Sequence, residues 1–305
     1  MLATHVERYV RVRQTLGFEL RDTARNLRHF ARFADERGDR HVRTSTSLEW
    51  AAAGSSPHTR HVRLRCVVQL ARFLHAEDSG HEIPPRAPFL RSRGRRKPYI
   101  YTPDEIQRLL GAARRIRATY PLRREVYTAL LGLISATGLR VSETRNLLLD
   151  DVLPDGILRI RNTKFGKTRL VPLHPSVVDA LGCYLDMRRK IATTDSHVFL
   201  SAGNARISSS MVNFTFRRIL VLSEVGFGAE RRPRIHDLRH SFATRALEKC
   251  AINREAVGRH FVALATYLGH AEIANTYWYF EATAELMADM AAASEELLVR
   301  EEPSS

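Results

Sequence analysis

Six side chains in the later part of the chain have the types needed to transfer a phosphoryl group without a metal ion. Arginines and histidines can hold the non-bridging oxygens of a pentacoordinate phosphate, a tyrosine can attack the phosphorus, and an acid can protonate the departing sugar oxygen. The candidates are Arg140, Arg239, His236 and His270, together with one of the lysines Lys164 and Lys167 and one of the tyrosines Tyr277 and Tyr279. Each of these residues could instead have a purely structural role. The helices and turns that carry them decide whether they meet at one phosphate.

The sequence HDLRH places His236, Arg239 and His240 within about one turn of a predicted helix, so their side chains project in neighbouring directions. HDLRH also resembles the zinc motif HExxH, with aspartate in place of glutamate. Zinc requires neutral imidazoles and tolerates a guanidinium poorly, whereas a phosphate favours histidine and arginine together. The motif therefore favours anion binding, and we expect no metal ligands here.

The segment ATGLRVSET predicts a turn at Gly138 followed by a new helix, with Ser142 as a plausible N-terminal cap. Arg140 lies at this junction, beside a helix that is predicted to be buried. An arginine in such a place needs an anionic partner, which can be Glu143 or a ligand phosphate. On its own, this arginine is more often part of a structural ion pair.

Two lysines, Lys164 and Lys167, lie in the turn of DGILRIRNTKFGKTRLVPL, which predicts two short strands joined as a hairpin. Turn lysines are commonly solvated. The chain has only five lysines, however, and an ammonium group in a tight turn can reach over a cleft.

Two tyrosines, Tyr277 and Tyr279, lie in the stretch NTYWYF, shortly after His270 at the end of ATYLGH. On a helix, positions two apart differ in direction by about 200°, so the two tyrosines cannot both face one phosphate. One of them can be a nucleophile while the other packs in the core. His270 taken alone can also be a helix cap.

Helical periodicity dominates the sequence from Thr102 onward, interrupted by the predicted hairpin. In YTPDEIQRLL, Thr102 can cap a helix, Pro103 suits its first position, and Glu105 completes a capping box. The run VYTALLGLISATG is apolar enough to predict a helix that is buried on all sides. We therefore predict a mainly α catalytic domain with a small β-hairpin or sheet, of the α+β class, over residues 101–305.

The composition favours a polyanionic partner. The 305-residue chain carries 48 Lys plus Arg against 33 Asp plus Glu, a net charge of +15, and phosphates that bind such a surface release counterions. The alternative is an arginine-rich chain with solvated basic faces. Its three cysteines, Cys66, Cys183 and Cys250, lie far apart among apolar residues and are interpreted as small core residues.

The start of the chain is charged, and no apolar run approaches the roughly 18 residues that span a bilayer. We therefore expect a cytoplasmic protein without a membrane partner.

Residues 1–82 predict a small all-α domain, because helical spacing recurs and no stretch alternates like a strand. Its helix RHVRLRCVVQLARFL is basic outside its apolar face. Residues 83–100 combine prolines, a glycine and cations without periodicity, which is typical of an extended linker. Its cations indicate that it lies along a negatively charged partner. The predicted DNA-binding residues are Arg60, Arg63, Arg93, Arg95, Arg96, Lys97 and Lys167.

Five motifs, in this order, make the sequence resemble the tyrosine recombinase family, also called the phage integrase family: ATGLRVSE, TKFGKTRLVPL, HDLRHSFAT, YLGH and a final tyrosine. The resemblance covers most of residues 100–285. Within it, the segments TYLGH and TYWYFEATAELM look like those of transposon-borne integrases. The stretch from Arg239 to His270 is longer than in compact members, which a longer helix or an extra loop would absorb.

The resemblance implies that residues 1–82 are a core-binding domain and that the two domains clamp double-stranded DNA at a specific recombination site. It also implies a homotetramer on DNA, possible accessory proteins, and a C-terminal segment, residues 286–299, that docks on a neighbouring protomer. Docking of this segment on its own protomer is the alternative.

Carried over position by position, the resemblance makes Arg140 and Arg239 the arginines that clamp the phosphate. Lys164, six residues before LVPL, matches the general acid toward the 5′ oxygen, whereas Lys167 does not. His236 matches the histidine that assists proton transfer from the nucleophile.

His270 matches the second histidine, which binds the scissile phosphate, and the family's nucleophile commonly lies nine residues later, at Tyr279. Tyr277 then packs in the core. Glu143 matches a supporting acidic position, and His240 matches a position that is usually structural.

These correspondences predict a site-specific DNA recombinase of a mobile element that forms a 3′-phosphotyrosine and requires neither ATP nor a metal cofactor. Three alternatives stand beside it: a type IB topoisomerase that nicks and reseals DNA, a DNA-binding protein with a decayed site, and a zinc hydrolase. The separate helical domain of residues 1–82 and the C-terminal segment favour recombination over relaxation, and the presence of all six catalytic positions opposes decay.

Overall fold

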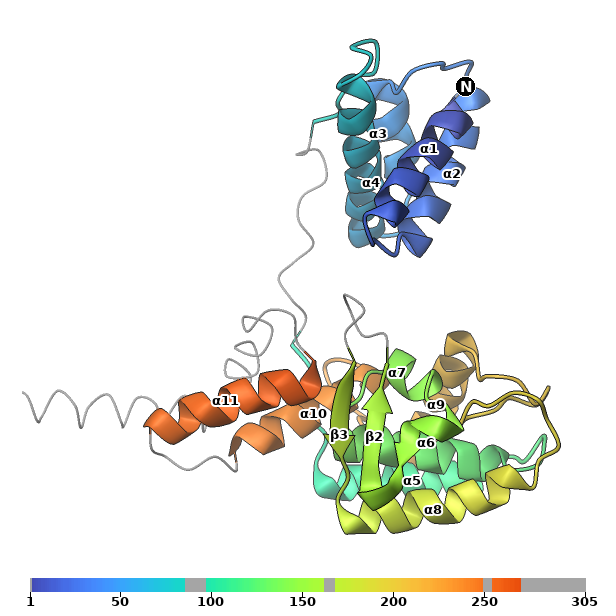
Figure 1. Ribbon diagram of the computed structural model, residues 1–305, viewed down its shortest axis with the longest axis vertical. Coiled ribbons are helices and arrows are strands. Elements are labelled where there is room, and N and C mark those ends of the chain that lie inside the picture. Colours follow the sequence, from blue (N-terminus) through green and yellow to red (C-terminus); the bar gives the residue numbers. More distant parts are fainter. Residues whose placement is uncertain (1, 86–96, 162–167, 249–253, 270–305) are drawn as a thin grey trace, which may run out of the picture. The chain divides into compact units, whose positions relative to one another are not determined.

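Four helices build the N-terminal part of the computed structural model (Figure 1). The structure describes residues 2–85, 97–161, 168–248 and 254–269. The chain divides into two units, Met1–Arg96 and Lys97–Ser305, and each has a hydrophobic core of its own. The helices of the first unit are α1 (Leu2–Thr15), α2 (Arg21–Asp35), α3 (Thr44–Ala52) and α4 (Pro57–His75).

The core of the first unit lies where the apolar sides of these helices meet. Leu27 and Phe30 of α2 are fully buried with Leu70 of α4 and with Trp50 of α3, which is 1% exposed. The indole nitrogen of Trp50 donates to His29 Nδ1 at 2.7 Å, so this buried polar group is satisfied. The prediction of an all-α N-terminal region is confirmed.

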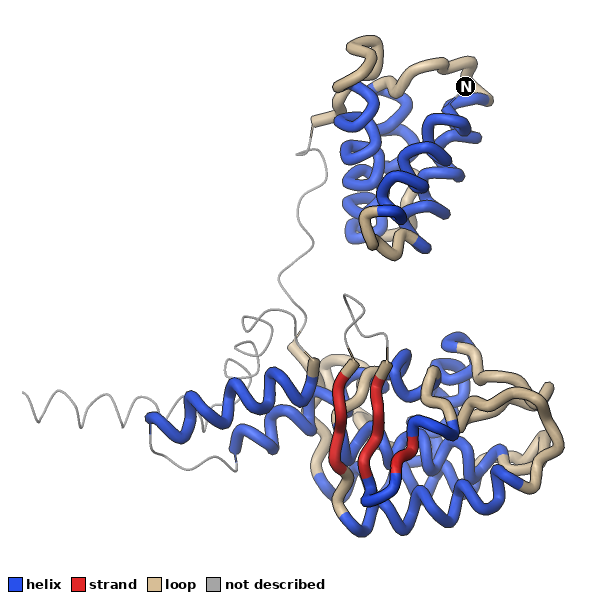
Figure 2. Tube along the Cα trace, in the orientation of Figure 1, coloured by secondary structure: helices blue, strands red, loops and turns tan. Residues whose placement is uncertain are grey.

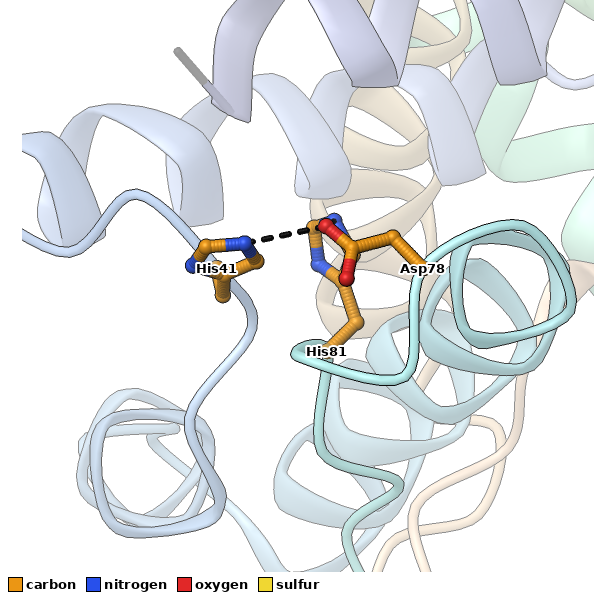
Figure 3. Close-up of side chains that lie close together, drawn as sticks. All are labelled: His41, Asp78 and His81. Atoms are coloured by element: carbon orange, nitrogen blue, oxygen red, sulfur yellow. Dashed lines mark hydrogen bonds and ion pairs between the residues drawn. The ribbon is translucent and has the colours of Figure 1, made fainter.

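Two loops of this unit are joined by a cluster that we call the histidine clasp: His41, Asp78 and His81 (Figure 3). His41 follows α2, whereas Asp78 and His81 follow α4. The Asp78 carboxylate accepts from His41 Nε2 at 3.0 Å, and buried His81 Nδ1 accepts from the Val42 backbone N–H at 3.0 Å. Glu82 N–H donates to Val42 O at 2.8 Å, so the clasp also joins the two loops through their backbones.

The second unit sets a small antiparallel sheet among helices (Figure 2). The sheet has the order β1-β2-β3, and Leu158 of β2 pairs with Val171 of β3. The elements of this unit are α5 (Pro103–Arg115), α6 (Arg123–Thr137), α7 (Val141–Arg145), the 3-10 turns η1 (Leu149–Asp151) and η2 (Pro154–Gly156), β1 (Val152–Leu153), β2 (Ile157–Ile160), β3 (Arg169–Pro172), α8 (Pro175–Arg189), α9 (Ser209–Ser223), α10 (Ile235–Glu248) and α11 (Arg254–Leu268). The predicted fold class, mainly α with a small sheet, is confirmed.

The start of α5 follows the predicted capping box: Thr102 Oγ1 accepts from Glu105 N–H at 3.2 Å, and the Glu105 carboxylate accepts from Thr102 N–H at 2.9 Å. The residue before it is fixed to α10. Tyr101, 1% exposed, donates its backbone N–H to Ser241 Oγ at 2.7 Å and its hydroxyl to Arg234 O at 3.0 Å. The chain that enters the second unit is therefore anchored on α10.

The prediction that Ser142 caps α7 is wrong. Ser142 is the second residue of α7, and the backbone N–H of Arg140 donates to the Glu143 carboxylate at 2.9 Å. A longer acidic side chain at the third helical position reaches back to the cap residue, so the serine is not needed.

The prediction that α6 is buried on all sides is also wrong, because its small residues face a groove of about 1080 Å³ between α5, α6, α8 and α10. Thr128 and Gly132 line this groove, and Ala136 is exposed. Cys183 of α8 lines it as well and is exposed, so only Cys66 among the described cysteines is a core residue. Cys250 lies outside the described residues. None of the described helices has the length and apolar character of a membrane crossing.

Candidate active site

Arg239 is the most deeply buried of the candidate catalytic side chains that the structure describes. It lies on α10 at 2% exposure, and its guanidinium donates to Gly138 O at 2.7 Å and to Leu268 O at 2.8 Å. Gly138 ends α6 with a φ of 63°, as the predicted turn requires, and Leu268 ends α11. Arg239 therefore joins the ends of two helices that are far apart in the sequence.

Arg140 lies at the start of α7 and is partly exposed, at 28% of its side chain. Its Nη1 donates to the Glu143 carboxylate at 2.7 Å, and its Nη2 donates to Gly269 O at 3.0 Å. Sequence reasoning left the partner of Arg140 open between Glu143 and a phosphate. The structure shows Glu143 as the partner, in a geometry that leaves the side chain at the surface.

Glu143 is held by a second arginine that sequence reasoning missed. Arg169, the first residue of β3, donates from Nη1 and Nη2 to the two carboxylate oxygens at 2.9 Å each. Burial raises the pKa of the Glu143 carboxyl, but hydrogen bonds and charges from Arg169 and Arg140 outweigh it and lower the pKa to about 2. The carboxylate therefore stays ionised between the two guanidiniums at neutral pH.

Three arginines meet at the C-terminal end of α11, and we call them the arginine cap: Arg140, Arg169 and Arg239. They donate to the successive carbonyl oxygens of Gly269, Tyr267 and Leu268, with Arg169 Nε at 2.8 Å from Tyr267 O. The last carbonyls of a helix have no partner inside the helix, and cations are favourable there. The arginine cap thus fixes the backbone directly before position 270.

His236 lies on the first turn of α10 and is exposed to solvent. Its ring packs edge-on against His240, with ring centroids 4.8 Å apart. Burial of part of the ring, followed by the positive charge of Arg239, lowers its pKa to about 4. His236 is therefore a neutral imidazole at physiological pH, able to accept or donate one proton.

The zinc interpretation of HDLRH does not fit this geometry. The Asp237 carboxylate, 1% exposed, accepts from the backbone N–H of Arg234 and from its guanidinium, each at 2.8 Å. Asp237 thus caps α10 instead of standing beside a metal-bound water, and the positive charge of Arg239 acts on the His236 ring and lowers its pKa. A positive field of this kind opposes a cation and suits an anion.

The histidine clasp also fits hydrogen bonding better than a metal ion, although its nitrogen and oxygen atoms lie within 4.8 Å of one another. Because Val42 N–H donates to His81 Nδ1, the proton of the neutral ring is on Nε2. This N–H faces Asp78 at 4.0 Å, so the His81 ring has no lone pair left for a metal. Metal-binding histidines show the opposite pattern and donate from their second nitrogen.

The other predicted site residues divide into two groups. Arg60 is exposed and donates to Gly54 O at 3.0 Å. Arg63 is half-buried, donates to Trp50 O at 3.1 Å and lies over the Trp50 ring. Both arginines therefore hold α4 against the end of α3. Lys97 is exposed. Outside the described residues lie Lys164, His270, Tyr277, Tyr279, Lys167, Arg93, Arg95, Arg96 and the segment 286–299.

A signal for Arg169 was present in the sequence. Strand residues two apart share a face, so in RLVPL the arginine lies on the face of Val171, which is buried. An arginine on a buried face requires an anionic partner. The signal was hidden because Leu170, on the other face, is also apolar and is 57% exposed.

Known proteins match the chain over most of its length. The phage integrase family matches residues 100–285. The y4rB protein of Sinorhizobium fredii, whose name describes it as an integrase/recombinase, is 39% identical over 296 residues, which cover 92% of this chain and 93% of that protein. Tyrosine recombinase XerD of Caulobacter vibrioides is 32% identical over 243 residues, which cover 78% and 75%.

Solved structures share the fold. The Tn1549 transposon integrase in complex with transposon right end DNA has a TM-score of 0.68 at 18% identity, covering 97% of this chain and 99% of that one. The XerH site-specific recombinase bound to its difH substrate has a TM-score of 0.65 at 18% identity, covering 90% and 79%. The family match spans the arginine cap and α10, so the chain belongs to the phage integrase family and is a tyrosine-type site-specific recombinase.

Proposed function

We propose that the protein cuts and rejoins DNA at a specific site through a 3′-phosphotyrosine, with Tyr279 as the nucleophile. The observation that carries this proposal is the convergence of Arg140 and Arg239 on the carbonyls of Gly269 and Leu268, immediately before His270. Two guanidiniums on one helix end, next to a neutral imidazole at position 236, form a surface for a phosphodiester.

In the proposed reaction, the Tyr279 oxygen attacks the scissile phosphorus and the bond from phosphorus to the 5′ oxygen breaks. Arg140, Arg239 and His270 stabilise the added negative charge on the non-bridging oxygens. Lys164 donates a proton to the departing 5′ oxygen. The freed 5′-hydroxyl of one strand then attacks the phosphotyrosine of a partner strand, which releases Tyr279 and restores a phosphodiester.

The proton of Tyr279 goes to His236 in this scheme. A histidine can act as the acceptor only when its ring is neutral, and the lowered pKa of about 4 keeps His236 neutral well below pH 7. The rate of strand cleavage should therefore stay high down to about pH 5.

The partner is double-stranded DNA carrying a recombination site, bound by a multimer of the protein. Support comes from the net charge of +15 and from the structural neighbours of the chain, which include a lambda integrase tetramer bound to a Holliday junction. We assign DNA contacts to the first unit, through Arg60, Arg63, Arg93, Arg95 and Arg96, and to Lys97 and Lys167 of the second unit.

The nucleophile is tested with nicked DNA that carries the cognate site, followed by denaturing electrophoresis. A covalent protein–DNA adduct should form with the unaltered chain and with Tyr277→Phe, and it should be lost in Tyr279→Phe. The matched pair controls for the removal of a tyrosine hydroxyl. The reverse pattern would make Tyr277 the nucleophile, and stoichiometric zinc in the purified protein would return the assignment to a metal hydrolase.

The groove between α5, α6, α8 and α10 is proposed to receive residues 286–299 of a neighbouring protomer. The groove joins apolar residues such as Leu110 and Leu133 to the arginines Arg114, Arg124 and Arg245. The segment LMADMAAASEELLV offers apolar residues together with three carboxylates, at Asp289, Glu295 and Glu296. Shape and charge are thus complementary.

Cys183, exposed in the groove, provides the test. One copy keeps Cys183, and a second copy of different size carries Cys183→Ala with Met290→Cys; Cys66 and Cys250 are replaced by serine in both. Oxidation on DNA should give a disulfide between the two copies. A disulfide that forms only when both cysteines are on one copy would mean that the segment docks on its own protomer.

The mobile-element role rests on the resemblance to transposon-borne integrases. It is tested by recovering the protein with covalently bound DNA from cells that carry its gene. Reads that map to the two ends of the DNA segment encoding the chain support the role. Reads at a single distant chromosomal site would assign the protein to another recombination task.

A further inference from the structure

We propose that Arg169 is a positioning residue for strand cleavage, which holds Arg140 and the backbone before residue 270 in the geometry that the phosphate needs. The inference rests on the proposed function. It assigns to Arg169 a role in the rate of the reaction in addition to its place in the fold.

The first argument is the chain of contacts that leads from Arg169 to Arg140. The Arg169 guanidinium donates side-on to both oxygens of Glu143, at 2.9 Å each. Glu143 in turn accepts from the backbone N–H and from Nη1 of Arg140, at 2.9 and 2.7 Å. With Glu143 at 7% and Arg169 at 12% exposure, solvent screens these bonds little. The direction of the Arg140 side chain therefore depends on Arg169.

The second argument is the contact between Arg169 and the end of α11. Arg169 Nε donates to Tyr267 O at 2.8 Å, and the guanidinium lies against Gly269, which has a φ of 68°. A Cβ atom at position 269 would lie 2.7 Å from Arg169 Nη1. Arg169 thus determines the path of the chain at the last residue before His270.

A positioning role fits better than direct contact with the phosphate. Among the described residues, the Arg169 guanidinium donates to the Glu143 carboxylate and to Tyr267 O. Its side chain is also less exposed than that of Arg140, 12% against 28%. Misplacement of a reacting group by about 1 Å typically costs on the order of 100-fold in rate. Loss of the two contacts that Arg169 makes, with Glu143 and with the end of α11, should therefore slow cleavage without weakening DNA binding.

Arg169 could also act through the hairpin, because it begins β3, and Lys164 lies just before this strand in the sequence. Substrate chemistry separates the two routes. When the 5′ bridging oxygen of the scissile phosphate is replaced by sulfur, the leaving group needs no proton, and the general acid becomes dispensable. A defect in the placement of Lys164 would then disappear, whereas a defect in the phosphate clamp would remain.

The experiment measures single-turnover cleavage at saturating nicked DNA, with oxygen and sulfur substrates, for Arg169→Gln and Arg169→Lys. We expect Arg169→Gln to cleave about 10- to 100-fold more slowly on both substrates, with an unchanged dissociation constant for DNA. Arg169→Lys should not restore the rate, because an ammonium cannot make the bidentate contact. Combined with Glu143→Gln, the Arg169→Gln defect should be less than additive, since the two residues act as a unit.

Arg159→Gln is the matched control. Arg159 lies on β2 in the same sheet and pairs with the buried carboxylate of Asp151 at 3.3 Å, and Arg161 keeps contact with that carboxylate after the substitution. Arg159→Gln should cleave within about threefold of the unaltered chain. Gly269→Ala, which pushes against Arg169 from the other side, is a second variant and should reproduce the slow cleavage.

The outcomes separate the inference from the proposed function. If the unaltered chain forms no adduct, the proposed function fails. If the unaltered chain forms an adduct and Arg169→Gln cleaves at the same rate, or regains that rate on the sulfur substrate, the inference about Arg169 is overturned and the proposed function stands.

Discussion

The histidine clasp of the first unit and the arginine cap of the second both fasten separate chain segments around one carboxylate. Asp78 is half exposed, at 54% of its side chain, accepts from His41 at 3.0 Å and faces His81 at 4.0 Å. Glu143 is 7% exposed and lies between two permanent cations. The same geometric task is thus carried out once with imidazoles and once with guanidiniums, which stay charged at any pH at which proteins are folded.

The difference matches what each cluster has to hold. Two loops of a helical domain need only be kept together. The arginine cap, in contrast, fixes residues beside the proposed phosphate site, where a change of charge would alter the chemistry. The contrast can be tested by removing either carboxylate, by removing the central histidine, and by changing the pH.

The largest effect is expected from Glu143→Gln. This change leaves Arg140 and Arg169 without the buried anion that joins them, and removing one partner of a buried ion pair costs about 3–5 kcal/mol. Hydrogen exchange of peptides from α7 and α11, read by mass spectrometry, should show the loss of protection in the second unit.

The matched control for Glu143→Gln is Asp151→Asn, which removes another buried carboxylate with two arginine partners in the same unit. It should destabilise the protein without slowing cleavage at saturating DNA. Equal loss of cleavage rate in both variants would show that Glu143 acts only through stability.

The next effect is expected from His81→Leu. The change leaves the Val42 backbone N–H buried without its acceptor, which costs about 1–3 kcal/mol. His81→Asn should recover part of this loss, because an amide oxygen can take the place of Nδ1. The free energy of unfolding is measured in urea from the fluorescence of Trp50, with the second tryptophan of the chain removed by Trp278→Phe. Identical stability of the Leu and Asn variants would contradict the role of the Val42 hydrogen bond.

A smaller effect is expected when the pH falls from 7 to 5. Burial and then neighbouring positive groups lower the pKa of His81 below its usual 6.5, and burial is also the first cause for His5. The native state therefore binds fewer protons than the unfolded state, so this stability is fully present above pH 6.5 and is lost as the pH falls through the lowered values. The charged and titratable groups that act on this cluster include His5, His41, His75, Arg8, Glu77 and Asp78.

Urea unfolding followed at Trp50 should thus show a first unit that weakens between pH 7 and 5, and His81→Asn should reduce this dependence. The Glu143 carboxyl behaves differently. Its pKa is lowered from 4.5 to about 2, so its contribution is complete above pH 4.5 and is lost only as the pH falls toward 2. The His236→Asn variant removes the titratable ring at position 236. If the hydrogen-exchange protection of α7 still changed between pH 7 and 5 in this variant, the contrast between the histidine clasp and the arginine cap would be contradicted.

The smallest effect is expected from Asp78→Asn. Ion pairs of exposed carboxylates contribute little to stability because water and salt screen them, and an asparagine oxygen can still accept from the Gly80 N–H that holds Asp78 at 2.8 Å. The Trp50 unfolding curve should therefore move little. A loss as large as that of Glu143→Gln would show that exposure does not distinguish the two carboxylates.

Local chemistry made part of this structure predictable from the sequence. The capping box at Thr102, the turn at Gly138 and the hairpin strands β2 and β3 depend on residues within a few positions of one another, and the structure confirms them. Strand β1 has only two residues, Val152 and Leu153, which is too short to show a periodicity.

The arginine cap was less accessible to sequence reasoning, because its contacts join distant residues. Arg169 lies 26 residues from Glu143 and 98 from Tyr267, and no local pattern reports such pairings. The motifs identified Arg140 and Arg239 as residues for one anion, but they did not indicate that both also hold the end of a helix. The groove was missed for a related reason: Gly132 and Ala136 were counted as apolar core, whereas their small size leaves a surface for another segment.

The anchoring of Tyr101 on α10 has a consequence for exchanging DNA-binding domains between recombinases. Because Tyr101 contacts Ser241 and Arg234, residues 97–101 belong to the catalytic unit even though they precede its first helix. A chimaera joined before Lys97 would carry these contacts with its catalytic half. A junction placed at the start of α5 would replace residues 97–101 with a foreign sequence. The chimaera would then lack the hydrogen bonds from Tyr101 to Ser241 and Arg234.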